Sequence, residues 1–460
     1  MCNNFNRGGR PMNMTILQHK TFFRSVCSLA IPAALQSILQ ASFSIVDQIM
    51  IGQLGSVSVA GVGLAGKFSS IYSVIVSAVG AVAGIMIAQY MGQQNRREIR
   101  RSFYLNLALA AGIALLFTVP CIVFPEQIMG FYTKDTRTLT AAAEYLAIIA
   151  GTFLPAAGAT LLSTLFRCME KAKLPLYGGI AAALLNTGLN YLLIFGKAGF
   201  PSMGAKGAGI ATLISQLANV LILLLLLIRH SEYLRKDRSS AADASVFHWK
   251  QYLSILLPIL VCEFVWSLGE NVYAAIYGRL GTESTAAMTL INPIQSLMIG
   301  ALCGLSQAAG VIIGKRLGNK EYEEAYTASK LLILYGFIGS AVLSLVIVAA
   351  APYYVRIYAV EDSVRQLTRQ ILTAYALIAP FKVQNMILGG GIIRSGGKTN
   401  YVMVIDLIGT WGLGVPLGLF AAFVLHLSIP YVYFILSLEE CFRFAISLVV
   451  LRRKKWMRSL

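Results

Sequence analysis

The sequence predicts an all-α integral membrane protein with 12 transmembrane helices, arranged in two six-helix lobes that are related by a parallel internal repeat. Three observations lead to this prediction. Of the 460 residues, 57% are hydrophobic and only 13% are charged, whereas soluble domains are about 45–50% apolar and about 25% charged. Twelve apolar segments are each long enough to cross a bilayer, which takes roughly 20 residues. Similar motifs also recur at a constant distance along the chain.

The apolar segments form two equal groups on either side of the longest hydrophilic stretch. We expect six spans in an N-lobe at 26–228 and six in a C-lobe at 251–451, joined by a cytoplasmic linker at 229–250. The predicted spans are, in order, 26–51, 59–91, 102–124, 138–166, 174–195, 208–228, 251–278, 285–313, 327–350, 367–393, 401–425 and 429–451.

The two ends of the sequence are hydrophilic and basic. Residues 1–25 are expected to form a cytoplasmic tail, in which the aromatic and basic segment "MTILQHKTFFRSVCSL" lies along the membrane surface. Residues 452–460 are expected to form a basic cytoplasmic tail. Lys and Arg are concentrated on the side that holds both termini, so the positive-inside rule places both termini in the cytoplasm and the chain in the plasma (inner) membrane. The net charge of +18 then reflects topology and attraction to membrane lipid, and nucleic acid is not an expected partner.

Motifs of soluble enzymes and ATP-driven pumps are missing from the sequence. The seven cysteines are scattered without a CxxC pair, and no Walker A loop, dinucleotide fingerprint or HExxH motif occurs. The sequence therefore predicts neither an enzyme nor a protein with a cofactor.

Two pairs of stretches resemble each other along the chain. "AIPAALQSILQASFSIVDQIMIGQLG" is similar to "LLPILVCEFVWSLGENVYAAIYGRLG", and "GIMIAQYMG" is similar to "GVIIGKRLG". Five Gly and Pro pairs are each separated by 226 positions: Pro32 and Pro258, Gly52 and Gly278, Gly55 and Gly281, Gly84 and Gly310, and Gly92 and Gly318. An even number of spans in each half makes the repeat parallel, and repeats of this kind are typical of transporters with a substrate site between the halves.

Ionisable residues inside spans usually face the bundle interior or a water-filled cavity, which makes them candidates for a site. Asp47 has no basic residue one helical turn away on either side, which favours a cation or proton site. Asn186 and Asn190 lie four residues apart in the fifth span and share a helix face. Their amides either bond between helices or supply oxygen ligands to a cation. With Asp47, they are the predicted position for Na⁺.

The seventh span carries Glu263, Trp266 and Glu270 on one helical face. Two carboxylates and an indole would form a wall suited to an organic cation, since the ring contributes its quadrupole and the carboxylates contribute charge. The alternative is that Trp266 faces lipid and both glutamates bond between helices.

Other charged residues occur in the later spans. Lys382, in the tenth span, could neutralise Asp406 of the eleventh span or a glutamate of the seventh, either as a structural pair or as a switch. The residues of the last span, Glu439, Glu440 and Arg443, have the spacing of a local ion pair, and a structural role is expected for them.

Several ordered motifs resemble the multidrug and toxic compound extrusion (MATE) family of bacteria. They are "IP…Q…VDQIMIGQLG", "AGIMIAQYMG", "LPILVCEFVWSLG…YGRLG", "IIRSGGKT" and "DLIGTWGLGVPLG", and the similarity covers about residues 20 to 455. The resemblance implies a V-shaped pair of lobes that exports small organic cations or drugs in exchange for Na⁺ or H⁺ by alternating access. We expect a monomer.

The resemblance also implies roles for particular residues. Asp47 matches the family's first-span aspartate, Asn186 matches a fifth-span asparagine, and Thr212 corresponds to a sixth-span threonine. The acids that some members carry in the seventh and tenth spans are replaced here by Trp266 and Val383.

Because these two acids are absent, we expect Glu263, Glu270 and Asp406 to serve in ion coupling. We expect Glu263, Trp266, Glu270 and Lys382 to contact cargo. The alternative within the same superfamily is a flippase for a lipid-linked precursor, which would need several Arg or Lys residues to hold a diphosphate.

Overall fold

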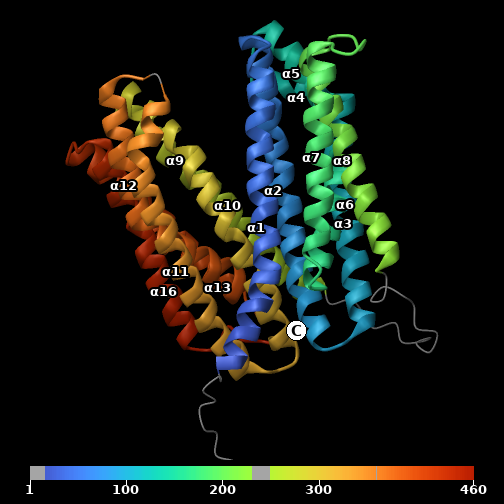
Figure 1. Cartoon of the computed structure of the whole chain (residues 1–460), viewed down its shortest axis with the longest axis vertical. Helices are drawn as coiled ribbons and strands as arrows, with labels where there is room; N and C mark the ends of the chain where they lie inside the picture. The colour runs from blue at the N-terminus through green and yellow to red at the C-terminus, as the bar shows by residue number, and fades with distance from the viewer. Residues whose placement is uncertain (1–15, 231–248, 359) are drawn as a thin grey trace, which may run out of the picture.

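The computed structural model describes residues 16–230, 249–358 and 360–460, and these residues form helices and connecting turns without a strand. Figure 1 shows two groups of helices that lie close together at the end where the chain's last residues lie and spread apart at the other end. The blue-to-green group comprises α1–α8 and the yellow-to-red group comprises α9–α16. We call these groups the N-lobe and the C-lobe, and we call the end where they meet the closed end.

The N-lobe contains six spans. Its helices are α1 (Ile16–Gly52), α2 (Ser56–Gly92), α3 (Arg96–Val123), α4 (Pro125–Gly130), α5 (Thr136–Ala150), α6 (Phe153–Cys168), α7 (Lys173–Phe195) and α8 (Gly204–Arg229). The fourth span consists of α5 and α6, which meet at an angle of 45°. Glycine and proline residues at such breaks allow a helix to bend, and Gly151 and Pro155 lie at this one.

The C-lobe contains the remaining spans, several of which include π-helical or 3₁₀ segments. Its elements are α9 (Trp249–Arg279), α10 (Thr282–Gly318), α11 (Tyr322–Tyr354), η2 (Val355–Ile357), α12 (Asp362–Asn385), η3 (Met386–Ile393), α13 (Asn400–Leu407), η4 (Ile408–Gly414), α14 (Val415–Leu419), η5 (Phe420–Val424), α15 (Ile429–Ser437) and α16 (Glu439–Arg452). The tenth span is α12 with η3, the eleventh runs from α13 to η5, and the twelfth is α15 with α16.

The predicted fold class is confirmed. Ten helical segments among the described residues are long and apolar enough to cross a membrane, and the pair α5–α6 makes an eleventh. The predicted span at 429–451 is the broken helix formed by α15 and α16.

The internal repeat is visible in the helix boundaries. The 226-residue offset that relates the Gly and Pro pairs in the sequence also relates both ends of α2 to both ends of α10, and each helix has 37 residues. The residues before these helices, Gly55 and Gly281, have φ angles of 91° and 115°. Glycine adopts this backbone conformation without the steric penalty that a side chain would bring, which explains why both positions are glycine.

The N-terminal segment differs from its prediction. α1 begins at Ile16, and both Phe22 and Val26 are buried against the protein. The described part of the segment expected along the membrane surface is therefore the beginning of the first spanning helix. Residues 1–15 and the linker residues 231–248 lie outside the described part of the chain.

The lobes meet where α2 and α10 end. A methyl group added to Gly92 would overlap the backbone of Lys315, and one added to Gly318 would overlap the backbone of Gln89. Near this crossing, Lys315 Nζ of the C-lobe lies 2.5 Å from Glu170 Oε1 of the N-lobe. The closed end is therefore a tight contact between backbones, with an ion pair beside it.

The segment expected to be a basic cytoplasmic tail also joins the lobes. Gln89 Nε2 donates hydrogen bonds to the carbonyl oxygens of Ser395 and Arg458 at 2.6 and 3.1 Å, and Gln89 Oε1 accepts one from Leu460 N at 2.7 Å. Trp456 has an exposed fraction of 0%. We call Gln89, Gln93 and residues 456–460 the interlobe clasp, since Gln93 Nε2 also donates to the Leu460 oxygen at 2.9 Å.

Candidate functional site

The first candidate site is a polar cluster inside the N-lobe, made of Asp47, Asn186, Asn190 and Thr212. Asp47 lies on α1, the two asparagines on α7 and Thr212 on α8, and α7 packs against both other helices. Asn190 Nδ2 donates to Asp47 Oδ1 at 2.6 Å and to Asn186 Oδ1 at 3.2 Å. The structure thus brings the four predicted residues of this lobe together.

The amide of Asn186 has an alternative orientation, turned over, that replaces its bond from Asn190 Nδ2 with one to Asp47. Its nitrogen then lies 2.9 Å from Asp47 Oδ1, and its oxygen accepts from Thr212 Oγ1 at 3.3 Å. Both asparagine nitrogens then point at the carboxylate, which supports the charged form of Asp47.

No Lys, Arg or His among the described residues forms an ion pair with Asp47. Asn190, which contacts Asp47, has a buried side-chain oxygen, Oδ1, without a hydrogen-bond partner among the described residues. A carboxylate with an unsatisfied amide oxygen beside it matches the oxygen ligands of a hard cation. The same groups could also be satisfied by a proton on Asp47, which would supply a donor.

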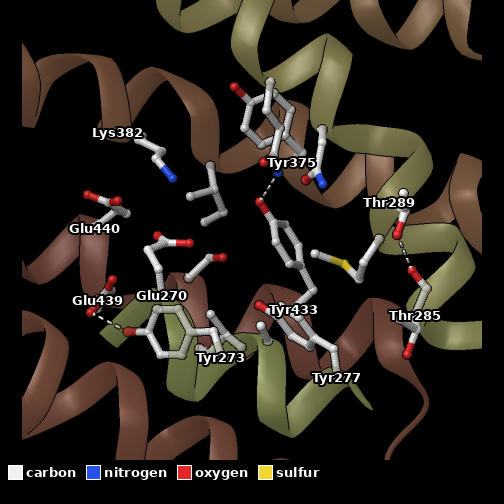
Figure 2. A pocket seen from close by; sticks show the side chains of 17 residues that line it. Glu270, Tyr273, Tyr277, Thr285, Thr289, Tyr375, Lys382, Tyr433, Glu439 and Glu440 are labelled. Carbon is white, nitrogen blue, oxygen red and sulfur yellow. Dashed lines mark hydrogen bonds between the residues drawn. The ribbon is translucent and has the colours of Figure 1, made fainter. Parts of the chain in front are cut away.

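The second candidate site is a cavity of about 300 Å³ inside the C-lobe. Figure 2 shows side chains from α9, α10, α12, α15 and α16 around it. The residues that line it are Glu270, Tyr273, Ala274, Tyr277, Thr285, Met288, Thr289, Asn292, Gln295, Tyr375, Ile378, Lys382, Tyr433, Leu436, Ser437, Glu439 and Glu440. Three carboxylates, one lysine and four tyrosines therefore face one space.

Two of the carboxylates are held by protein partners. Tyr273 Oη donates to Glu439 Oε2 at 2.9 Å, and Asn385 Nδ2 donates to Glu440 Oε2 at 2.7 Å. Arg443 Nη1 lies 3.4 Å from the same Glu440 oxygen. The ion pair expected within the last span is thus present for Glu440, whereas Glu439 bonds to the seventh span.

A chain of polar contacts runs behind the cavity. Arg394 Nη1 lies 3.4 Å from Glu263 Oε1, and Arg394 Nη2 lies 3.2 Å from Cys262 Sγ. Cys262 Sγ donates to Asp406 Oδ2 at 2.6 Å, and Asp406 is in turn paired with Arg443. Glu263 and Asp406 therefore each have a basic partner in this structure.

The structure separates some residues that the sequence placed together. Only Glu270 of the predicted wall lines the cavity, because Glu263 turns to Arg394 and Trp266, with 45% of its surface exposed, lies outside it. The alternative in which Lys382 neutralises Asp406 is wrong, since Arg443 of the neighbouring α16 occupies that position. Lys382 faces the cavity together with Glu270.

The sequence indicates a structural role for Glu439 and Glu440 and does not reveal that they line a cavity together with four tyrosines. Their spacing predicts one local ion pair, although a single Arg443 leaves one of the two glutamates without a basic partner in that span. This surplus of one acidic residue over basic residues in the last span indicates that one glutamate has a partner elsewhere. The tyrosines gave no signal, because an isolated Tyr in an apolar span is equally compatible with ordinary packing.

A family model described as MatE matches the chain at residues 32–192 and 258–420. The two matched regions fall in the two lobes and together cover most of the sequence.

Curated relatives are similar over nearly the whole chain. The "Probable multidrug resistance protein NorM" of Thermotoga maritima is 24% identical over 436 residues, which are 94% of this chain and 93% of that protein. The human "Multidrug and toxin extrusion protein 1" is 23% identical, over 92% of this chain and 73% of the human protein.

Solved structures share the fold. A Vibrio cholerae MATE transporter aligns with a TM-score of 0.86 at 16% identity, covering 95% of this chain and 99% of that one.

Proposed function

Because the chain belongs to the MATE family of transporters, we propose that it is a secondary active antiporter that exports organic cations or drugs in exchange for Na⁺ or H⁺. The relatives named as multidrug resistance and extrusion proteins support this proposal. In this proposal, the protein lies in the plasma (inner) membrane with both termini and the closed end on the cytoplasmic side. The described conformation is then the outward-facing one.

The observation that carries the proposal is the N-lobe polar cluster. Among the residues that the structure describes, Asp47 has no basic partner, and it is bonded to Asn190, whose own oxygen is unsatisfied. Burial disfavours a free carboxylate, so a cation or proton relieves this cost when it binds. Entry of one charge across about 100 mV releases about 2.3 kcal/mol, which would drive export.

The C-lobe cavity is the proposed cargo site. It carries three carboxylates and one lysine, a balance that favours cargo with a positive charge. A lipid-linked diphosphate would instead need several Arg or Lys groups. This balance supports the exporter over the flippase of the same superfamily.

Alternating access would couple the two sites. The lobes would rock about their contact so that the cavity faces each side of the membrane in turn. The close approach of α2 and α10 and the interlobe clasp would have to open before cargo could enter from the cytoplasm.

Transport in proteoliposomes tests the proposal. A fluorescent organic cation should be exported when an inward Na⁺ or pH gradient is imposed, and the gradient that works identifies the coupling ion. The Asp47→Asn variant serves as the matched control. Cation movement that is independent of both gradients would contradict antiport.

A further inference from the structure

The segment that follows α16 has a backbone that joins the lobes and side chains that carry positive charge. The carbonyl of Arg458 and the amide of Leu460 bond to Gln89 of the N-lobe at 3.1 and 2.7 Å. Figure 1 marks the end of the chain at the closed end, between the two lobes. Four basic residues of this segment are exposed, and we call them the basic patch: Arg452, Arg453, Lys455 and Arg458.

The side chains that hold this segment in place are distinct from those of the basic patch. Lys454 Nζ lies 2.6 Å from Glu323 Oε1 of α11, and it also lies 4.6 Å from the centre of the Tyr326 ring. Trp456 is buried, and its Nε1 donates to the Leu451 oxygen at 3.2 Å. The segment is therefore fixed by its buried and paired side chains, and the basic patch points away from those contacts while the interlobe clasp is closed.

The basic patch has no acidic partner among the described residues, since none of their ion pairs includes a member of it. The carboxylate of Glu323 pairs with Lys454 instead. Like charges this close together along a chain repel one another. A surface of negative charge would offset that repulsion by contacting all four side chains.

We propose that the basic patch binds the anionic headgroups of the cytoplasmic leaflet, and that this binding stabilises the closed end. Clusters of Lys and Arg directly after a transmembrane helix are typical of segments that bind anionic lipid. The inference rests on the proposed function, which places the closed end at the cytoplasmic surface, and it adds regulation by lipid composition to that function.

The direction of the effect follows from what an opening of the lobes would break. In the described conformation, Gln89 and the burial of Trp456 hold the backbone of the segment in one position. Loss of those contacts would free the backbone that carries the basic patch, and a partner would then have to order it again on binding. A partner that binds one of two conformations better shifts the equilibrium toward it. Anionic lipid therefore favours the closed end over its opening.

Distances between spin labels in lipid nanodiscs test the inference. Labels at Arg96 and Tyr322, where α3 of the N-lobe and α11 of the C-lobe begin, report the separation of the lobes at the closed end. The full chain is compared in discs of phosphatidylcholine and in discs of equal parts phosphatidylcholine and phosphatidylglycerol. We expect the fraction of long distances to be at least about threefold larger in the neutral discs.

Variants of the basic patch assign the effect to its charges. Replacement of all four residues by Gln should abolish the difference between the two kinds of disc, with both giving the distribution that the wild type has in neutral discs. The clasp remains intact in this variant, because Trp456, Lys454 and the backbone bonds to Gln89 are unchanged. Replacement of the three arginines by Lys should retain the lipid dependence, since the attraction depends on charge.

A matched control removes the same amount of charge elsewhere on the protein. Four exposed basic residues near helix ends outside the clasp are replaced by Gln: Lys20, Arg24, Lys173 and Arg229. This variant should respond to phosphatidylglycerol as the wild type does. If it loses the response as completely as the basic-patch variant, the effect comes from the overall charge and the proposed surface is refuted.

Further outcomes separate lipid from other anions and this inference from the export proposal. Sodium phosphate added to neutral discs should not reduce the long distances; if it does so as well as phosphatidylglycerol, the patch binds free anions and the lipid surface is refuted. Identical distributions in the two kinds of disc, or more long distances with phosphatidylglycerol, would also refute it. These distances require no cargo and no gradient, so a failure of cation export in proteoliposomes would overturn the export proposal alone.

Discussion

Gly92 ends α2, and Gly318 ends α10 at the 226-residue distance of the repeat. Gly92 touches the backbone of α10, and Gly318 touches the backbone of α2. The contacted residues, Lys315 and Gln89, are separated by the same 226 positions. The two lobes therefore meet through a contact that the repeat has made symmetric. Neither glycine has room for a methyl group.

The first prediction concerns this contact. Gly318→Ala should lower the thermal unfolding temperature, because a methyl group would overlap the Gln89 backbone and overpacking costs typically about 1–3 kcal/mol. Gly63→Ala is the matched control, since nothing lies near a methyl group at this position of α2. Differential scanning fluorimetry of both variants in detergent measures the effect. If Gly318→Ala and Gly63→Ala unfold at the same temperature, the contact between the lobes accommodates the methyl group without a loss of stability.

The second prediction concerns ion coupling. Asp47→Asn should leave expression and folding intact, because a neutral amide is cheaper in a membrane than a carboxylate. It should reduce gradient-driven export to background, since the amide neither titrates nor provides charge for a cation. Export by proteoliposomes is the measurement. Glu144→Gln is the control, because this carboxylate pairs with Lys206 at 3.0 Å outside the cluster; full activity of Asp47→Asn would refute the assignment.

The third prediction separates the members of the N-lobe polar cluster. Asn190→Ala removes the bond of 2.6 Å to Asp47, and hydrogen bonds to charged groups contribute about 1.5–3 kcal/mol. The affinity for the coupling ion should therefore fall by about tenfold or more. Thr212→Ala should have a smaller effect, because Thr212 contacts Asn186 and not Asp47. The dependence of export on ion concentration measures both, and the reverse order would contradict the geometry.

The fourth prediction concerns the interlobe clasp. Gln89→Ala would leave the backbone groups of Ser395, Arg458 and Leu460 without their partner, and an unsatisfied buried group costs about 1–3 kcal/mol. The closed end should open more often.

Spin labels can detect that opening. Labels at Arg96 and Tyr322, the first residues of α3 and α11, should show a longer and broader distance distribution in Gln89→Ala than in the wild type. Gln53→Ala changes the residue that follows α1, at the end of that helix away from the closed end. This variant should leave the distance distribution unchanged. An unaltered distribution in Gln89→Ala would mean that the clasp does not hold the lobes.

The sequence was sufficient to predict features that depend on local pattern. Apolar length predicted the spans, and the spacing of Pro32, Gly52, Gly92 and their partners predicted a repeat that reappears in the ends of α2 and α10. The amide pair Asn186 and Asn190 shares a helix face by spacing alone, although that spacing does not reveal that the face meets Asp47 of another helix.

The contacts between distant helices could not be predicted in this way. Whether Asp406 meets Lys382 or Arg443 depends on which helix packs beside α13, and no spacing along the chain determines that. Trp456 shows the same limit. It lies in a short basic segment, a composition typical of exposed tails, yet it is buried where it packs against Gly396 of the C-lobe.

The interlobe clasp also imposes an order on biosynthesis. Gln89 and Leu460 are 371 positions apart, so at translation rates of about 5–20 residues per second Leu460 is added roughly 20–70 s after Gln89. During that interval, the nascent N-lobe has no partner for the buried amide of Gln89. A ribosome that stalls within the C-lobe would therefore leave a complete N-lobe beside an incomplete C-lobe, without the C-terminal residues that join the two.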